Sequence, residues 1–252
     1  RVAFEKIDGV TELQMRSGKA RPGFKYVGVH MVFDIKMDGQ FTRKARLVAD
    51  GHTTDAPSSI TYSSVVSRDS VRLGLLIASL NDLDLAACDI GNAYLCADIV
   101  SEHVFCSPPE GRERPGYVMY LQKALYGLKK SAKAWFDTFS EFLTEIGYTR
   151  SDFDDCLWEY KNGDKKVYIV VFVDDLLVIG DDSYINDFMT CVNKKFKIRD
   201  LGEAKSFLGM EITRNRENRT LKISQTKYIE KMATRFNLNK AKPVYTPSDT
   251  IE

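Results

Sequence analysis

The sequence lacks long hydrophobic runs. No stretch approaches the roughly 18 consecutive apolar residues of a membrane-spanning helix, so we expect no membrane partner. The start of the chain, RVAFE, lacks the apolar stretch of a signal peptide, and the chain does not begin with Met. We therefore expect an intracellular protein that is a piece of a longer chain.

Cysteine and histidine are scarce as well. The three histidines stand in no metal-ligand spacing and no C-x-x-C pair occurs, which disfavours a zinc site. An odd number of widely spaced cysteines also disfavours a disulfide framework and fits a reducing compartment. The five are Cys88, Cys96, Cys106, Cys156 and Cys191.

A strong net charge of either sign is missing too, because the chain carries only +1 at pH 7. This balance hides a segregation: residues 1–50 and 121–136 each carry +4, residues 194–242 carry +9, and the remainder carries −16. Basic segments around an acidic middle suit a protein that holds a polyanion over a carboxylate-bound metal, since phosphate neutralisation supplies most nucleic-acid affinity. Ordinary solvated charged faces explain the charge pattern equally well.

What the sequence does contain is a pair of adjacent carboxylates, Asp174 and Asp175, between two apolar runs within residues 167–180. Ionised carboxylates in an apolar frame are costly to desolvate unless they are paired or bind a metal, and the neighbouring positions hold no Lys or Arg. A divalent cation is one natural counter-charge. The alternative is a plain β-hairpin with a solvated turn, although Asp-Asp suits two-residue turns poorly because they favour Gly or Asn.

Residues 27–48 predict another hairpin. Apolar residues alternate over 27–37, the Asp-Gly pair at 38–39 offers a tight turn, and a strand resumes over 41–48. The two-residue period places Lys44 and Arg46 on one face of the return strand. That face suits phosphate binding; an edge strand protected by charge is the alternative.

The remaining elements alternate without the βαβ rhythm of a parallel sheet, so we predict an α+β fold with an antiparallel sheet. Residues 84–90, 207–213 and 220–224 predict strands, and the segment after Lys242 predicts a disordered tail. Ser67 fits the N-cap of a first helix. Three helices are predicted from apolar stripes. The first stripe comprises Val71, Leu75, Leu76 and Leu80, and the last comprises Tyr228, Ile229, Met232 and Phe236. The middle stripe comprises Trp135, Phe136, Phe139, Phe142, Leu143 and Ile146, and Gly147 is the predicted end of that helix.

Five motifs follow one another along the chain: KARLVA at 44–49, DIGNAYL at 89–95, LYGLKKS at 125–131, FVDD at 172–175 and FLGMEI at 207–212. In order and approximate spacing they closely resemble the reverse transcriptase of copia-type LTR retrotransposons, over nearly the whole chain. The resemblance implies a right-hand polymerase with a ferredoxin-like antiparallel palm, fingers built partly from the hairpin at 27–48, and a partial thumb near 225–242. Residues 1–242 would form the reverse transcriptase domain, and 243–252 a flexible tail towards a downstream region.

The same resemblance implies the catalytic and metal-binding residues. The family's three catalytic aspartates correspond to Asp89, Asp174 and Asp175, which would hold two Mg²⁺ ions, with Mn²⁺ as a substitute and the main-chain carbonyl of Ile90 as a further ligand. Hard oxygen ligands and substrate phosphates are what Mg²⁺ prefers. The implied reaction is extension of a primer 3′-hydroxyl with dNTPs by the two-metal scheme.

Residues that contact the nucleotide are also implied. Lys44 and Arg46 match the basic residues that hold the triphosphate, with Arg46 as the closer contact. Tyr94 matches the aromatic residue that excludes a ribose 2′-hydroxyl, although it could instead fill the core. A loop that lines the nucleotide pocket is matched by Tyr126, Gly127 and Lys129; Lys130 departs from the family's more usual Gln.

The segment at 207–212 resembles the primer grip, which would comprise Phe207, Leu208, Gly209 and Met210; a plain hairpin is the alternative. Phe172 replaces the Tyr that usually precedes the V-D-D motif, so a hydroxyl near the primer backbone is lost.

The implied partners are an RNA or DNA template, a primer, dNTPs, and the integrase and RNase H parts of a Pol polyprotein. The implied location is the cytoplasm, in a virus-like particle, with nuclear delivery. Two other hypotheses compete: a catalytically inactive nucleic-acid-binding relic, and a metal-dependent phosphohydrolase that uses the same carboxylates.

Overall fold

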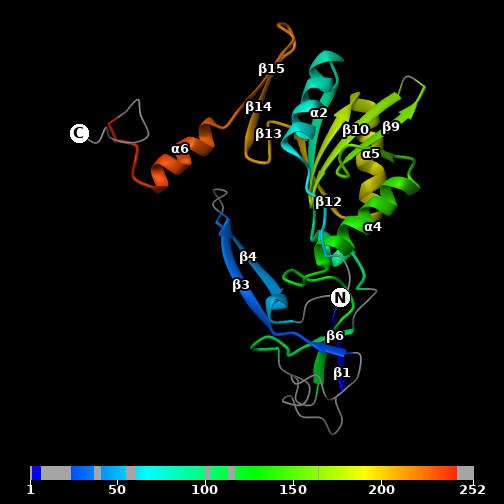
Figure 1. Cartoon of the computed structure of the whole chain (residues 1–252), viewed down its shortest axis with the longest axis vertical. Helices are drawn as coiled ribbons and strands as arrows, with labels where there is room; N and C mark the ends of the chain where they lie inside the picture. Colours follow the sequence, from blue (N-terminus) through cyan, green and yellow to red (C-terminus); the bar gives the residue numbers. More distant parts are fainter. Residues whose placement is uncertain are drawn as a thin grey trace.

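The computed structural model describes residues 2–6, 24–36, 41–54, 61–99, 103–112, 117–163 and 165–242. Its largest element is a six-stranded sheet in the order β12-β5-β11-β10-β9-β8, in which every neighbouring pair is antiparallel (Figure 1). The strands are β5 (Asp84–Ile90), β8 (Thr149–Arg150), β9 (Leu157–Asn162), β10 (Lys165–Phe172), β11 (Asp175–Gly180) and β12 (Ile198–Glu203). The α+β class with an antiparallel sheet is confirmed.

Three helices pack against this sheet: α2 (Arg68–Leu80), α4 (Ser131–Glu145) and α5 (Asp182–Lys195). Ser67 caps α2 by accepting a hydrogen bond from the Ser70 amide, as the sequence predicts. Beyond the end of α4, Gly147 adopts a φ of +89°, which is typical of a glycine that ends a helix. The apolar runs of β10 and β11 are almost wholly buried because helices and neighbouring strands cover them, and they form the centre of the main hydrophobic core.

A second sheet lies at the other end of the molecule (Figure 1). It has the order β1-β7-β6-β2 and comprises β1 (Val2–Lys6), β2 (Phe24–Tyr26), β6 (His103–Cys106) and β7 (Tyr117–Leu121). Four of its buried residues, Val104, Cys106, Met119 and Leu121, form a separate, smaller cluster with Val27, Ala49 and Leu125.

The hairpin predicted for 27–48 is present as β3 (Val29–Lys36) and β4 (Thr42–Ala49), which pair in register from Val29–Ala49 to Lys36–Thr42. Its predicted Asp-Gly turn lies outside the described residues, as does the predicted tail at 243–252. Two short helices, η1 (Gly51–Thr53) and α3 (Ala93–Cys96), follow β4 and β5 respectively. None of the helices in the described ranges combines the length and apolar character that spanning a membrane requires.

The C-terminal part contains a three-stranded sheet and a helix. The predicted strand at 207–213 is wrong in detail: β13 (Ser206–Phe207) and β14 (Met210–Asn215) are separated by a turn at Leu208 and Gly209, whose φ values are +48° and +77°. β15 (Thr220–Ser224) agrees with the prediction.

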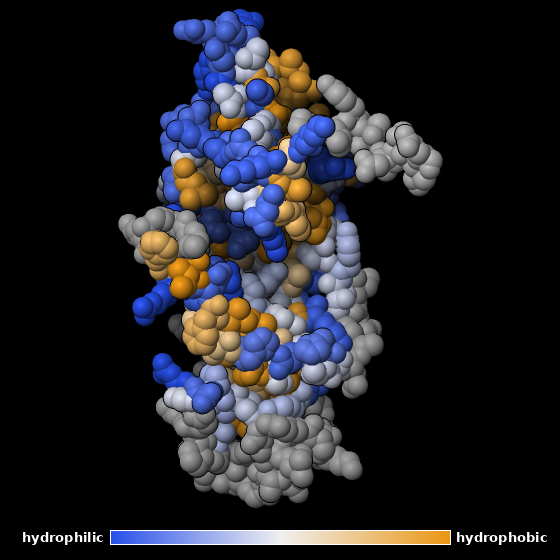
Figure 2. Space-filling view, turned by 90° about the vertical axis from the view of Figure 1, so that its left-hand side faces the viewer, coloured by the Kyte–Doolittle hydropathy of each residue, from blue (hydrophilic) through white to orange (hydrophobic). Residues whose placement is uncertain are grey.

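Two predicted apolar stripes are not buried as expected. Helix α6 (Thr226–Arg235) has no buried residue, and the side chains of Tyr228, Ile229 and Phe236 are 52 to 65% exposed. On α2, Val71 and Leu75 are buried, whereas Leu76 and Leu80 are exposed. In Figure 1 the β3–β4 hairpin and α6 project to the left, and Figure 2 shows orange hydrophobic side chains at the surface of that side.

Candidate active site

Three carboxylates gather where β5 and β11 meet. Asp175, the first residue of β11, lies directly opposite Asp89, the penultimate residue of β5. Asp174 precedes β11, and its main-chain carbonyl accepts a hydrogen bond from the Ile90 amide at 2.8 Å. The resemblance implies that these aspartates hold the same metal ions, and the structure brings them together where two adjacent strands meet, despite their separation in sequence.

The turn that carries Asp174 is not formed by the Asp174–Asp175 pair, although these two residues lie between the two apolar runs in the sequence. Because Phe172 pairs with Asp175, the two turn residues are Val173 and Asp174, and the Asp-Asp pair straddles the turn and the strand. Val173 has a φ of +56°, a left-handed conformation that β-branched residues rarely adopt. The indole Nε1 of Trp135 donates a hydrogen bond to the Val173 carbonyl at 2.6 Å.

Two of these carboxylates, Asp174 and Asp175, have pKa values raised above the ordinary value. Burial raises the pKa of Asp174, and the charge of Asp89 adds to this; burial raises the pKa of Asp175, with contributions from Asp174 and Asp89. Like charges directly opposite one another in an antiparallel pair are destabilising. No ion pair joins these aspartates to a cation within the part of the chain that the structure describes. The cluster therefore favours a bound cation.

The donor set fits a hard divalent cation. The described residues contain no group of three or more His, Cys, Asp or Glu side chains arranged to hold a metal by themselves. Mg²⁺ in phosphate-processing sites is held by one or two carboxylates plus substrate phosphates and water, not by an all-protein cage. Partly buried carboxylates at neighbouring strand ends fit that mode of binding.

Two cations of the β3–β4 hairpin face this cluster. In the strand register Arg46 lies opposite Val32 and Lys44 opposite Asp34, so both side chains project from the same face. Both lower the pKa of Asp174, against the larger effects of burial and of the Asp89 charge. Arg43 projects from the opposite face.

Tyr94 and Tyr126 form an aromatic wall beside the carboxylates. Their ring centroids lie 4.8 Å apart at an interplanar angle of 62°, an edge-to-face contact. Burial raises the pKa of each phenol, and the charge of Asp174 raises both further. Tyr94 belongs to α3, which begins shortly after β5, so its position follows directly from that of Asp89.

The loop at 125–131 is joined to the end of the hairpin. The Ala49 amide donates to the Tyr126 carbonyl at 2.7 Å, and the Lys129 ammonium donates to the Thr54 carbonyl. Gly127 has a φ of +87°, and a Cβ there would lie 2.0 Å from the Ala49 carbonyl oxygen. Only glycine permits this close backbone approach.

The segment predicted as the primer grip forms the β13–β14 hairpin. Phe207 is buried in the main core, and Leu208 and Gly209 form the turn before Met210 begins β14. This geometry is compatible both with a primer grip and with a plain hairpin.

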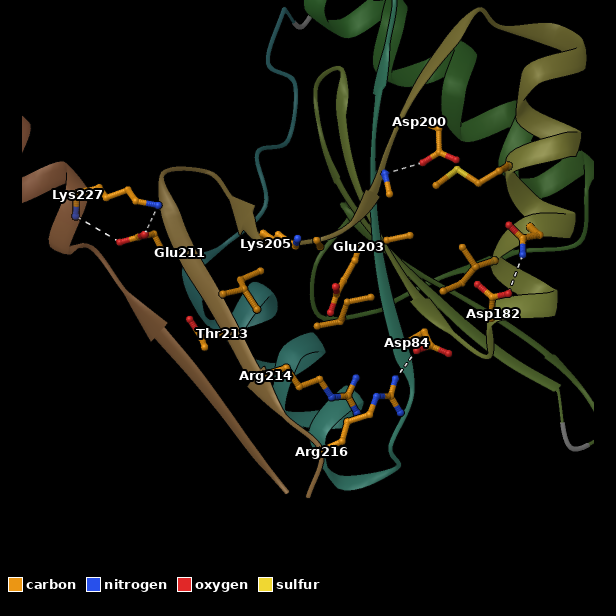
Figure 3. Close-up of a pocket in the computed structure, with 18 residues that line it drawn as sticks. Asp84, Asp182, Asp200, Glu203, Lys205, Glu211, Thr213, Arg214, Arg216 and Lys227 are labelled. Carbon is orange, nitrogen blue, oxygen red and sulfur yellow. Dashed lines mark hydrogen bonds and ion pairs between the residues drawn. The ribbon is translucent and has the colours of Figure 1, made fainter. Parts of the chain in front are cut away.

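A cavity of about 600 Å³ lies elsewhere, between β5, α5, β12 and β14 (Figure 3). Its lining includes Arg214, Arg216 and Lys227, each of which is ion-paired with a carboxylate. Because none of the three aspartates described above lines it, this cavity is not part of the candidate site.

Trp135 is the residue near the site that sequence reasoning missed. Its helical spacing predicts a core aromatic, and it is indeed 2% exposed. The hydrogen bond to Val173 depends on tertiary placement, so the only available signal was the position of an indole donor within a predicted core.

Strand-end carboxylates faced by cations and aromatic residues are compatible with a phosphate-bearing ligand held through a divalent metal. The family model described as "Reverse transcriptase (RNA-dependent DNA polymerase)" matches residues 18–250, and the chain belongs to this family.

Curated relatives agree with this assignment. The chain is 35% identical over 226 residues to the retrovirus-related Pol polyprotein from transposon TNT 1-94 of Nicotiana tabacum, covering 86% of this chain and 17% of the relative. It is 35% identical over 230 residues to that from transposon RE1 of Arabidopsis thaliana, covering 88% and 16%. It is 31% identical over 222 residues to the Ty1-NL2 Gag-Pol polyprotein of Saccharomyces cerevisiae, covering 82% and 12%. The resemblance to copia-type elements is confirmed, and the chain spans less than a fifth of these relatives' length.

Similar solved structures are more distant. A foamy viral protease–reverse transcriptase in complex with double-stranded DNA is 13% identical, with a TM-score of 0.46 over 88% of this chain and 34% of that one. Telomerase from Candida albicans with a telomeric RNA fragment is 8% identical, with a TM-score of 0.47 over 94% and 51%. Both TM-scores are too low to establish a common fold.

Proposed function

We propose that the chain is an RNA-directed DNA polymerase that extends a primer 3′-hydroxyl with dNTPs. The observation that carries this proposal is the pairing of Asp175 with Asp89 across adjacent strands, with Asp174 beside them. Membership of the reverse transcriptase family supports the proposal, and neighbouring carboxylates at strand ends suit the two-metal scheme of nucleotidyl transfer.

In this proposal Asp89, Asp174, Asp175 and the Ile90 carbonyl hold two Mg²⁺ ions, or Mn²⁺ in their place. When bound, these ions supply activation of the primer hydroxyl and charge stabilisation of the leaving pyrophosphate. The aspartates fix where the primer end and the α-phosphate meet. The raised pKa values of Asp174 and Asp175 imply that metal-free carboxylates hold protons more tightly, so metal binding competes with protonation.

The residues around the carboxylates orient the nucleotide. Lys44 and Arg46 neutralise the triphosphate from the hairpin side. Tyr94 lies under the incoming sugar and rejects a 2′-hydroxyl by steric exclusion, while Tyr126, Gly127 and Lys129 line the same pocket. The β13–β14 turn, from Phe207 to Met210, holds the primer end.

We assign the six-stranded sheet to the palm, the β3–β4 hairpin to the fingers and α6 to the beginning of a thumb. The template is RNA or DNA. Integrase and RNase H activities belong to other parts of the Pol polyprotein, and we place the protein in a cytoplasmic virus-like particle with later nuclear delivery.

Primer extension on an RNA template with Mg²⁺ and dNTPs tests the proposal. The wild type should extend the primer, and Asp89→Asn and Asp174→Asn should each lower the rate at least about 100-fold, since each removes a metal-binding charge. Asp69→Asn, a change at an exposed carboxylate on α2, is the control and should leave the rate unchanged. Binding to primer–template without incorporation would instead identify a relic, and equal extension by all variants would remove the aspartates from the mechanism.

A further inference from the structure

We propose that Trp135 is a positioning residue whose indole N–H fixes the orientation of the peptide between Val173 and Asp174, and so directs the Asp174 carboxylate towards Asp89. This inference rests on the proposed function, because it concerns the site where the metal ions would bind.

The indole itself is held firmly. Trp135 lies on α4 and is 2% exposed. Its ring stacks on Phe139 with centroids 5.3 Å apart and meets the edge of Phe196 at 5.4 Å and 85°. Since aromatic contacts constrain it from two directions, its N–H points in a fixed direction, and that direction is the Val173 carbonyl, 2.6 Å away.

The orientation of the Val173 carbonyl, which accepts this hydrogen bond, distinguishes two types of turn. Val173 has a φ of +56°, whereas Asp174 is not among the residues with positive φ. That combination corresponds to a type II′ turn, and rotation of the central peptide would give a type I′ turn with a positive φ at Asp174. The oxygen of this central peptide is the Val173 carbonyl. The hydrogen bond from Trp135 therefore selects one of the two arrangements and sets the direction of the Asp174 side chain.

The next carbonyl is held independently. The Asp174 carbonyl accepts a hydrogen bond from the Ile90 amide in β5, whereas the indole N–H donates to the Val173 carbonyl. One end of the turn is thus fixed by the strand that carries Asp89, and the other by α4. Removal of the indole donor frees only the α4 side, where a hollow of about 20 Å³ is lined by Trp135, Trp158 and Val173.

The test compares Trp135→Phe with Trp158→Phe. Trp158 is 3% exposed and lines the same hollow, but within the described residues it makes no hydrogen bond to the turn. Both variants should lower the melting temperature. Only Trp135→Phe should lower kcat for primer extension, about tenfold, corresponding to about 1.4 kcal/mol, and raise the Mg²⁺ concentration needed for half-maximal rate, with the affinity for primer–template unchanged.

A sharper version keeps the shape of the ring. Because the chain has two tryptophans, Trp158→Phe leaves Trp135 as the only one, and growth with benzothienylalanine replaces its N–H by sulfur at nearly constant volume. Compared with Trp158→Phe that carries ordinary tryptophan, this protein should show the loss of kcat expected for Trp135→Phe with little further fall in melting temperature.

A measurement that needs no catalysis separates this inference from the proposed function. Mn²⁺ affinity of the free protein, followed by electron paramagnetic resonance, should fall several-fold in Trp135→Phe and remain unchanged in Trp158→Phe. Equal Mn²⁺ affinity in wild type and Trp135→Phe would overturn the inference. If the wild type fails to extend primers while the Mn²⁺ difference is observed, the proposed function fails and the role of Trp135 stands.

Discussion

At the scale of single residues, Gly127 shows how one missing side chain joins two parts of the site. It combines a φ of +87° with backbone contact to Ala49, so an added Cβ meets both strain and a clash. Gly163 is the matched case: its φ is +63°, but nothing lies within 4 Å of an added Cβ. Comparison of the two therefore separates the cost of the conformation from the cost of the contact.

We predict that Gly163→Ala lowers the free energy of unfolding by about 1–2 kcal/mol, the usual cost of a left-handed L-residue. Gly127→Ala should cost more than about 4 kcal/mol, because backbone cannot move aside as a flexible side chain can. Urea unfolding followed by circular dichroism measures both values. Equal costs for the two variants would show that the loop at Gly127 shifts away from the hairpin without penalty.

Asp174 illustrates a conflict between stability and function. Burial and the charge of Asp89 raise its pKa, so the folded protein binds protons more tightly than the unfolded chain. The contribution of Asp174 to the free energy of unfolding is therefore most favourable at acidic pH. It is lost as the pH rises through the pKa that Asp174 has in the folded protein. In the absence of metal at pH 7, Asp174→Asn should raise the melting temperature, by roughly 2–4 °C for each kcal/mol gained in the free energy of unfolding. The same change should lower the rate of primer extension at least about 100-fold. Mg²⁺ should then stabilise the wild type more than the variant.

Asp154 provides the opposite case and the control. Burial raises its pKa, but hydrogen bonds from Ser70, Ser67 and Cys156 outweigh burial, and the net pKa lies below its usual value. The contribution of Asp154 to the free energy of unfolding is present at pH values above the pKa of Asp154 in the unfolded chain. It is lost as the pH falls through the lower pKa that Asp154 has in the folded protein. Asp154→Asn should therefore destabilise the protein at pH 7. Melting curves in which both Asn variants shift in the same direction would contradict this account.

At the scale of elements, β4 presents different side chains to its two sides. Lys44 and Arg46 face the carboxylates, and Arg43 faces away. Arg46→Ala should raise the KM for dNTP about tenfold and change kcat less, since a charge-assisted contact to phosphate is worth about 1.5–3 kcal/mol. Arg43→Ala, on the opposite face of the same strand, should stay within about twofold of wild type in steady-state extension. A similar rise in KM for both variants would indicate a general charge effect and not a directed contact.

How far these elements could be predicted follows from what each pattern encodes. The stripe of α4 was predictable because burial on one face leaves a period in the sequence. The alternation over 27–48 also predicts its hairpin correctly, although Met31, Phe33 and Ile35 on these strands are exposed. The stripe of α6 also has the helical period, yet none of the residues of α6 is buried. Its exposure was not predictable, because an apolar pattern shows that one face of a helix is apolar but not whether another element covers that face. The displaced turn at Val173 was not predictable, since its conformation depends on Trp135 and Ile90, which are remote in sequence.

At the scale of the whole molecule, the meeting of Asp89 with Asp174 and Asp175 was predicted from motif order, and the sheet confirms it. Periodicity alone could not have paired β5 with β11, because the whole of residues 90–173 lies between Asp89 and Asp174 in the sequence. The link came from the resemblance to a known family, carried by the order of the five motifs, and the need of carboxylates in an apolar frame for a counter-charge agrees with it.

The molecule also contains two hydrophobic clusters of unequal size. Of the residues that the structure describes, seven form the cluster of the second sheet and thirty-five form the main core. The smaller cluster buries less apolar area and should open at lower denaturant concentration. Buried cysteines provide a probe for each: Cys106 lies in the smaller cluster, and Cys88 and Cys156 lie in the main core.

We predict that maleimide labels Cys106 at a lower urea concentration than Cys88 and Cys156. Burial raises the pKa of all three thiols to about 12, so none should react while its cluster is folded. Mass spectrometry of peptides from protein labelled across a urea series measures each site, and the partly exposed Cys96 and Cys191 serve as controls that react without urea. Labelling of all three buried cysteines at one urea concentration would show instead that the two clusters unfold as a single cooperative unit.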